Sequence, residues 1–409
     1  MILTGLDRLL LDARELAGRR YAFLGHGASV TADGRPGHLA LVATGTPPTL
    51  LLGPEHGYHG IEQDMIPAAG GREPWTGIEV VSLYGSDEDS LRPDPETFAG
   101  LDLLLIDLQD VGSRYYTYVA SALWAAEAAF SAGCEVWILD RPNPLGGAVL
   151  EGPPVEAGYD SFVSAFRTPV RHGCTLGELA RLEGLRRPES GLARCRVWPV
   201  EGWQRDALWP GLGAPGIGGR PWVSPSPNMP SLGAALVYPG TCLVEATELS
   251  EGRGTARPFE WIGAPWLDPV GLAERLAARE LPGVTFLPLY FRPQFQKHSG
   301  TECGGVQLLV TDFESFHPLR TGVEILFACR DSSPMDFRWR EAPYEFVADR
   351  PAIDLLTGGE HCRRAMDEGD REAFDRWIAS WTEYEASFAA ERREILLYDG
   401  PGGPGDLPA

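Results

Sequence analysis

Short apolar runs alternate with helical segments over the first half of the chain, and this alternation restricts the fold more than any other feature. Helical segments cover residues 117–132, which stop at Gly133, and residues 175–185, where Thr175 is a favourable N-cap. The runs short enough to be strands lie at 21–24, 49–52, 80–83, 101–106, 136–139 and 196–200. This pattern is typical of a parallel sheet with crossover helices. The sequence therefore predicts an α/β fold with a mostly parallel sheet.

A chain of 409 residues is long for one compact unit, so we expect two domains. Residues 201–235 are dense in Gly, Pro and Trp, and they predict an irregular connection. Beyond them we expect strands at 284–291 and 306–310, helices near 269–279 and 316–330, and an amphipathic helix or helix pair over 363–397. We therefore predict a first domain over residues 1–235, which carries most of the site, and a smaller α+β domain over 236–409.

Acidic side chains outnumber basic ones by 57 to 35, which gives a formal net charge of −22. This charge repels nucleic acid and anionic membrane surfaces, so we expect neither as a partner.

No apolar run approaches the roughly 20 residues that span a bilayer, and residues 1–20 lack the layout of a signal peptide. Seven scattered cysteines without a C-x-x-C pair fit a reducing compartment. We expect a cytoplasmic protein, and the sequence carries no signature of an oligomeric state.

Polar clusters punctuated by glycine or proline follow several of the apolar runs. They lie at 53–57, 107–116, 140–144, 225–230 and 250–255, and the first three come directly after predicted strands. The carboxyl ends of the strands in an open α/β sheet form the crevice where ligands bind. Carboxylates, arginines and aromatic rings gathered there predict an enzyme site for a polar small molecule.

Glu55 is the leading candidate for acid chemistry. It follows a buried strand, and Pro54 and Gly57 fix its loop and let a substrate approach closely. A carboxyl group in such a partly apolar crevice can act as a general acid. The alternative is that Glu55 caps the following turn. The capping interpretation is stronger for Asp107 and Asp110, because an aspartate after a strand commonly caps the next helix.

Three tyrosines in the second cluster have two interpretations. Tyr115, Tyr116 and Tyr118 form either a surface on which a sugar stacks or a helix start that packs on the core. The sequence favours neither interpretation over the other.

Charged residues in the later clusters differ in what they predict. Asp140 and Arg141 suggest a structural ion pair that leaves Asn143 facing the cleft. Glu251 and Arg253 are surrounded by glycines, so packing alone does not explain them. We therefore expect both to belong to the site.

Two common sequence motifs lack the surrounding secondary structure that their usual functions require. Residues 211–216 match G-x-G-x-x-G but follow no strand and open no helix, so no dinucleotide or other cofactor is predicted. The spacing of His56 and His59 suggests a metal site, yet the surrounding Pro and Gly break the helix that this spacing needs. A metal-dependent hydrolase or amidase that uses His56, His59, Asp110 and His172 remains the second hypothesis, although no metal is expected.

Taken in order, the clusters closely resemble one family. It was long described as a bacterial domain of unknown function and was later tied to exo-acting β-N-acetylmuramidases, which are glycoside hydrolases of peptidoglycan recycling. The matching stretches cover about residues 20–315 and read GPEHGYHG, VSLYG, DLQDVGSRYYTYV, LDRPNPLGG, EGPPVE, RHGCTLGELA, PSPNMPS, VYPGTCLVEATELSEGRGTARPFEWIGAPW and CGGVQLLVTD. The chain departs from its relatives at His26, where they usually carry a Thr-Asn pair, and in lacking their secretion signal.

The resemblance implies a Rossmann-like N-terminal domain, a smaller C-terminal domain and an active site in the cleft between them. It implies the release of N-acetylmuramic acid from the non-reducing end of peptidoglycan fragments, with Glu55 as the catalytic general acid/base. Asp110 and Glu251 are our further catalytic candidates, and the second catalytic group stays open. A non-catalytic amino-sugar-binding protein is the third hypothesis. The expected substrate-binding residues are His56, Arg114, Tyr116, Tyr118, Asp140, Arg141, Asn143, Arg171, His172, Asn228 and Arg253.

Overall fold

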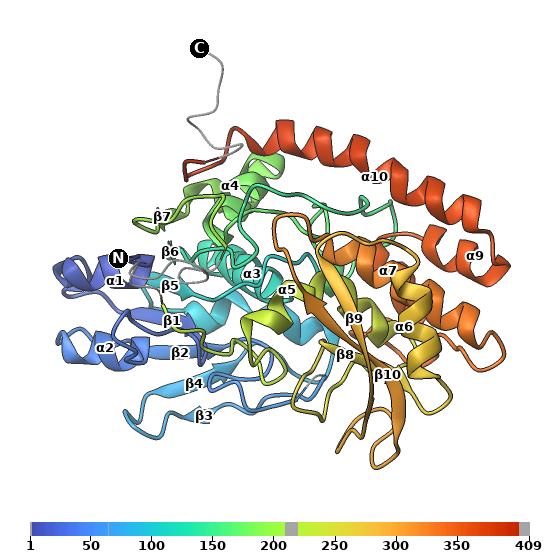
Figure 1. Cartoon of the computed structure of the whole chain (residues 1–409). Coiled ribbons are helices and arrows are strands. Elements are labelled where there is room, and N and C mark those ends of the chain that lie inside the picture. Colours follow the sequence, from blue (N-terminus) through green and yellow to red (C-terminus); the bar gives the residue numbers. More distant parts are fainter. Residues whose placement is uncertain (1, 64, 209–219, 401–409) are drawn as a thin grey trace.

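The computed structural model describes residues 2–63, 65–208 and 220–400 of the chain. The first half forms a seven-stranded sheet in the order β3-β4-β2-β1-β5-β6-β7, and the second half carries a three-stranded sheet in the order β8-β10-β9. Figure 1 shows the small sheet with its own helices at one side of the large sheet. The predicted α/β class, with a mostly parallel sheet and a second, smaller α+β part, is confirmed.

The large sheet is parallel except at one edge, where β3 (Gly71–Arg72) runs antiparallel to β4. Its parallel strands are β1 (Tyr21–Gly25), β2 (Leu50–Gly53), β4 (Glu79–Ser82), β5 (Leu103–Asp107), β6 (Glu135–Leu139) and β7 (Arg196–Trp198). All six coincide with predicted strands to within a few residues. Central β1 and β5 are buried along their whole length, as parallel strands covered on both faces must be.

Helices cover both faces of the large sheet, and the alternation along each strand decides which side chains meet which helices. On one face, Phe23 of β1 packs in a cluster with Leu6 of α1 (Gly5–Leu11) and Leu41 of α2 (Gly37–Ala43). On the other face, Leu24 belongs to the main core with Leu123 of α3 (Tyr118–Ser131) and with α4 (Leu176–Arg186). Both α3 and α4 were predicted, and Thr175 caps α4 as expected.

The small sheet is antiparallel and consists of β8 (Trp261–Ala264), β9 (Val284–Phe291) and β10 (Cys303–Val310). The predicted helices near 269 and 316 are α6 (Pro269–Ala277) and α7 (Pro318–Ser332). The amphipathic tail is a helix pair, α9 (His361–Glu368) and α10 (Arg371–Arg392), preceded by α8 (Ala352–Thr357).

Helix α5 (Leu232–Thr241) joins the two halves and was not predicted, because it begins inside the Gly- and Pro-rich stretch. It lies directly against α7, and two glycines permit this close approach. A Cβ atom on Gly322 would come within 2.2 Å of the carbonyl oxygen of Gly240. Only glycine fits at such a backbone contact.

The two halves share one core, since a single cluster of buried side chains includes Leu24 of β1, Val306 of β10 and Leu326 of α7. The chain also returns to the large sheet after α10. Leu397 donates its backbone N–H to Glu178, and the Tyr398 hydroxyl donates to Asp140. The end of the second half therefore stabilises the first half directly.

Candidate active site

A pocket lies beyond the carboxyl end of β2, between the two halves of the chain. Both halves contribute side chains to its wall. The lining residues are Glu55, His56, Tyr115, Tyr116, Thr117, Tyr118, Val163, Ser226, Asn228, Met229, Tyr238, Glu245, Arg253, Phe259, Tyr344 and Glu345. Six predicted site residues are thereby brought together: Glu55, His56, Tyr116, Tyr118, Asn228 and Arg253.

Glu55 is buried in this pocket with 5% of its surface exposed. Its Oε2 accepts a hydrogen bond of 2.7 Å from the Thr117 hydroxyl. Thr117 precedes α3 but makes no capping bond to that helix, so its hydroxyl is available for Glu55. The carboxylate is therefore bound by a side chain across the pocket, which disfavours the capping interpretation.

A tight reversal of the chain holds Glu55 at the strand end. His56 and Gly57 both have left-handed backbones, with φ of 70° and 77°. The His56 Nδ1 lies 2.9 Å from the carbonyl oxygen of Glu62, which closes the loop. Gly53 has no room for a side chain, because a Cβ there would lie 2.5 Å from the backbone nitrogen of Tyr58. The G-P-E-H-G sequence thus encodes a loop that presents one carboxyl group.

The three tyrosines pack in the core and also line the pocket, so core packing is confirmed and stacking on a sugar stays a prediction. The ring centroids of Tyr116 and Tyr118 lie 4.8 Å apart, and Tyr238 packs edge-on against Tyr116 at 5.8 Å. The Tyr118 hydroxyl donates to the carbonyl oxygen of Pro225 at 2.6 Å. The Tyr116 hydroxyl lies near the hydroxyls of Ser226 and Tyr118, and burial raises the pKa of Tyr116.

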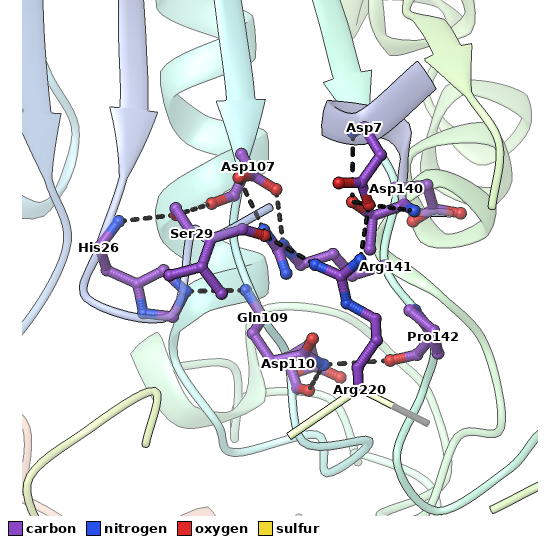
Figure 2. Close-up of polar contacts among 12 residues, drawn as sticks. Asp7, His26, Ser29, Asp107, Gln109, Asp110, Asp140, Arg141, Pro142 and Arg220 are labelled. Carbon is purple, nitrogen blue, oxygen red and sulfur yellow. Dashed lines mark hydrogen bonds and ion pairs between the residues drawn. The ribbon is translucent and has the colours of Figure 1, made fainter. Parts of the chain in front are cut away.

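His26 lies behind the pocket rather than in its lining. Its Nδ1 lies 3.1 Å from the carbonyl oxygen of Pro225, and its Nε2 accepts the backbone N–H of Gln109 at 2.9 Å (Figure 2 shows the Gln109 contact). Burial lowers the pKa of His26 to about 3, so the ring is neutral. It ties the end of β1 to the 107–116 and 225–230 clusters. Within the latter, Asn228 lines the pocket and donates to Gln63 at 2.8 Å.

Arg253 also lines the pocket and is flanked by two carboxylates. It lies 2.5 Å from Glu245 and 3.3 Å from Glu251, and its guanidinium covers the Phe259 ring. Glu251 itself does not line the pocket. It pairs with Lys297 at 2.9 Å, and although burial alone would raise its pKa, Lys297 and Arg253 hold that pKa below the usual value. Glu251 therefore anchors Arg253.

Asp110 and His172 form a buried pair outside the pocket lining. The His172 Nε2 lies 3.4 Å from Asp110, whose carboxylate also accepts the Gly112 N–H at 2.6 Å. Burial opposes the charged form of His172, but Asp110 outweighs burial and raises the His172 pKa to about 9. This pairing favours a scaffold role for both residues.

Arg114 likewise lies outside the pocket lining. Its guanidinium donates to the carbonyl oxygens of Pro153 and Thr168 at 2.7 Å and of Leu356 at 2.9 Å, and burial lowers its pKa to about 10. Arg171 is buried in a similar way and donates to the carbonyl oxygen of Leu145 at 2.7 Å. Both arginines bind backbone rather than face the cleft.

Arg141 pairs with Asp107, at 2.6 Å, and not with its neighbour Asp140 as predicted (Figure 2). Asp140 instead accepts hydrogen bonds from the Thr175 hydroxyl and the Gly177 N–H at the start of α4. Burial raises the pKa of Asp140 to about 6.

Asn143 does not face the cleft. Its amide donates to the carbonyl oxygen of Cys174 at 3.0 Å and accepts the N–H of Leu145 at 2.9 Å. The clusters after β5 and β6 therefore contribute mainly to the scaffold.

The residues of the metal hypothesis do not converge. His56 contacts the Glu62 backbone, His59 lies 3.8 Å from Glu73, and His172 pairs with Asp110. Over residues 2–63, 65–208 and 220–400, no group of three or more His, Cys, Asp or Glu side chains is placed to hold a metal ion. The glycine motif at 211–216 lies outside the described residues.

Two acidic residues of the pocket lining, Glu245 and Glu345, were not predicted. Glu245 falls between a helix and the 250–255 cluster, so no strand end marks it. Glu345 lies beyond the stretches that carry the family resemblance.

No helix in the described part of the chain is both long and apolar enough to cross a membrane.

A Rossmann-like sheet joined to a smaller α+β part, with a buried glutamate and tyrosines at the strand ends, defines a two-part α/β protein with an acidic small-molecule pocket. The chain belongs to the exo-β-N-acetylmuramidase NamZ family of glycoside hydrolases. The model of the family's N-terminal part matches residues 21–233, and that of its C-terminal part matches residues 236–398.

Relatives of known name or structure agree with this membership. The peptidoglycan β-N-acetylmuramidase NamZ of Bacillus subtilis is 38% identical over 97% of this chain and 91% of its own length. Two crystal structures of DUF1343 family proteins from Bacteroides fragilis superpose with TM-scores of 0.83 and 0.74, at 28% and 25% identity. They match 97% and 98% of this chain, and 99% of each of theirs.

Proposed function

We propose that this chain is an exo-acting hydrolase that releases N-acetylmuramic acid from the non-reducing end of peptidoglycan fragments. The observation that carries the proposal is the buried Glu55 carboxyl group, held by Thr117 in a pocket lined with tyrosines. The family and the printed name of the Bacillus subtilis relative support the same activity.

Glu55 would supply the proton that the leaving sugar needs. A glycosidic oxygen is a poor leaving group unless it is protonated as the bond breaks. Oε2 of Glu55 accepts the Thr117 hydroxyl, so Oε1 is the oxygen assigned to proton transfer. The Tyr116 hydroxyl lines the same pocket and is a candidate donor to the sugar.

Arg253 would recognise the lactyl carboxylate that distinguishes muramic acid from glucosamine. It is the one arginine or lysine that lines the pocket among the described residues. A guanidinium can bind a carboxylate through two parallel hydrogen bonds. Glu245 and Glu251 hold the guanidinium in place, and Lys297 offsets the charge of Glu251.

Two features support a small substrate rather than a long strand. The pocket lies between the two halves of the chain, and its lining residues are buried. The net charge of −22 also disfavours long anionic glycans. None of the seven cysteines, all of which lie in the described part of the chain, forms a disulfide, which supports work in the cytoplasm on imported fragments.

Product analysis on a muramyl-glucosaminyl disaccharide tests the proposal. We expect free N-acetylmuramic acid and N-acetylglucosamine, with no release from a disaccharide whose non-reducing sugar is glucosamine. Chelator treatment should leave the rate unchanged, whereas loss of activity would favour the metal-dependent hydrolase. Ligand-induced thermal stabilisation without turnover would favour the non-catalytic amino-sugar-binding protein.

A further inference from the structure

We propose that residues 341–349 form a lid, which opens to admit the amino sugar to the pocket and closes over it. The identity of the ligand rests on the proposed function, whereas the motion of the lid can be measured without turnover. The pocket is closed in this structure, because none of its sixteen lining residues is more than 7% exposed. A sugar that carries its aglycone therefore reaches Glu55 only when part of the wall moves.

The long segment between α7 and α8 is the part of the wall best suited to move. It covers residues 333–351, and this fully described stretch contains neither a helix nor a strand. Loops longer than about 12–15 residues without secondary structure are uncommon in compact domains, and active-site lids are among their usual functions. Tyr344 and Glu345 of this segment line the pocket, whereas residues 341–343 and 348–349 on either side are exposed. The segment thus has the length and the position of a lid.

Both ends of the lid are attached to the rest of the protein. Before it, the backbone N–H of Arg340 donates to the carbonyl oxygen of Ala246 at 2.8 Å. After it, the Arg350 guanidinium lies over the ring of Tyr159, 4.8 Å from the ring centroid. These contacts provide two pivots for the residues between them.

The tip of the lid is a strained two-residue turn. Tyr344 and Val347 exchange backbone hydrogen bonds of 3.0 and 2.9 Å, which places Glu345 and Phe346 in the middle of the turn. Both have left-handed backbones, with φ of 46° and 67°, and positive φ strains a residue that carries a Cβ atom. Strained residues of this kind cluster at ligand clamps and switch regions. Opening the lid releases this strain, which lowers the free-energy cost of leaving the closed position.

Side chains attach the tip to the body of the protein. The Tyr344 hydroxyl donates to Glu245 at 2.7 Å, and the Tyr84 hydroxyl donates to Glu345 at 3.1 Å. The Phe346 ring packs against Tyr84, with the ring centroids 5.7 Å apart. Contacts of this kind hold the lid closed, and they can break without disrupting a helix or a sheet.

Another loop of the pocket wall, residues 225–229, is fixed through its backbone instead. The Tyr118 hydroxyl, on α3, donates to the carbonyl oxygen of Pro225 at 2.6 Å. At the other end, Trp222 Nε1 donates to the carbonyl oxygen of Met229 at 3.0 Å. Residues 341–349 are therefore the part of the wall that moves.

Hydrogen exchange of the free protein is the first test. A lid that opens on its own exposes its amides without global unfolding. The Tyr344 and Val347 amides should therefore exchange roughly 100-fold or more faster than the amides of α5, after correction for intrinsic rates. Exchange as slow as in α5 would mean that the lid opens only when the whole protein unfolds, and would overturn the proposal.

Phe346→Ala is the second test, because it removes the ring that holds the lid to Tyr84 and leaves the pocket lining intact. The variant weakens the closed form equally with and without ligand. The rates of binding and of release of N-acetylmuramic acid, the proposed product, should both rise by about three- to tenfold, with an unchanged Kd. Stopped-flow tryptophan fluorescence measures both rates. Phe313→Ala, at an exposed position outside the pocket lining, is the matched control and should leave the rates unchanged.

Failure of the lid and failure of the proposed function give different results. A wild type that cleaves the disaccharide, but whose Phe346→Ala variant shows unchanged rates or a Kd raised by faster release alone, would reject the lid. A wild type that neither binds N-acetylmuramic acid nor cleaves the disaccharide would reject the function. In that case the exchange of the Tyr344 and Val347 amides still decides whether the lid opens.

Discussion

The loops after β2 and after β5 and β6 look alike in sequence but behave differently in the structure. After β2, Glu55 faces a pocket and is held by one hydroxyl from Thr117. After β5 and β6, Asp107 and Asp140 are bound by Arg141 and by the start of α4. Polar residues at a strand end therefore identify a site only when their hydrogen-bonding capacity is left for a ligand.

The largest expected effect is a loss of turnover when Glu55, in the loop after β2, is substituted. Glu55→Gln keeps the size of the side chain but removes its acidity, so turnover on the disaccharide should fall about 10²–10⁴-fold. The Tm should change little, because the Thr117 hydroxyl can still donate to the amide oxygen. Steady-state kinetics with the disaccharide and with an aryl muramide measure the loss. Near-wild-type activity would mean that Glu55 is structural, and that the loop after β2 belongs to the scaffold like the loops after β5 and β6.

A substitution in the loops after β5 and β6, which belong to the scaffold, should lower the free energy of unfolding rather than turnover. Asp107→Asn leaves the buried Arg141 guanidinium without its carboxylate, and breaking a buried pair typically costs about 3–5 kcal/mol. Urea unfolding measures the change, and turnover of the folded protein should remain near normal. Asp33→Asn, in the exposed pair with Arg35, is the control and should leave the unfolding midpoint unchanged. A stable but inactive Asp107→Asn would move this network into the site.

A substitution of Arg253 tests whether the pocket recognises the lactyl carboxylate of the substrate. Arg253→Lys keeps a cation beside Glu245 and Glu251 but loses the second hydrogen bond to a carboxylate. We expect the KM for a muramide to rise about tenfold, since a charged hydrogen bond contributes ~1.5–3 kcal/mol. The comparison substrate is the lactate-free glucosaminide, measured by inhibition, whose affinity should stay constant. Equal losses for both sugars would remove Arg253 from lactyl recognition.

The smallest effect is a pH dependence of stability on the scaffold side. Burial raises the pKa of Asp140 to about 6 and of Glu151 to about 7, and Asp110 raises that of His172 to about 9 despite burial. The folded protein therefore holds these protons more tightly than the unfolded chain does. The stability that each group contributes is complete only below its unfolded pKa, which is about 3.9 for Asp, 4.3 for Glu and 6.5 for His. It is lost as the pH rises from there to the folded pKa of about 6 for Asp140, about 7 for Glu151 and about 9 for His172.

Thermal unfolding between about pH 4 and 9.5 measures this loss, which should be a few degrees in Tm. His172→Gln should flatten the part of the curve between about pH 6.5 and 9, because the raised His172 pKa acts there. An unchanged slope in this variant would contradict the assigned direction for His172.

Local pattern was enough to predict the large sheet and Glu55. The strands are apolar runs bounded by turn residues, and Glu55 follows directly after one of them, so sequence neighbours alone locate it. Partners distant in sequence could not be found in this way. Arg114 resembles a substrate ligand until Leu356 is seen to accept its hydrogen bond. Glu345 likewise depends on Tyr84, and no period or motif near residue 345 indicates that contact.

Asp140 joins both ends of the described chain. Its carbonyl oxygen accepts the N–H of Gly5, and its carboxylate accepts the hydroxyl of Tyr398. A cut near residue 235 would therefore leave the large sheet without the segment that closes it, although the family models divide the chain there. The two halves should melt in a single calorimetric transition and should not be exchangeable as modules between relatives.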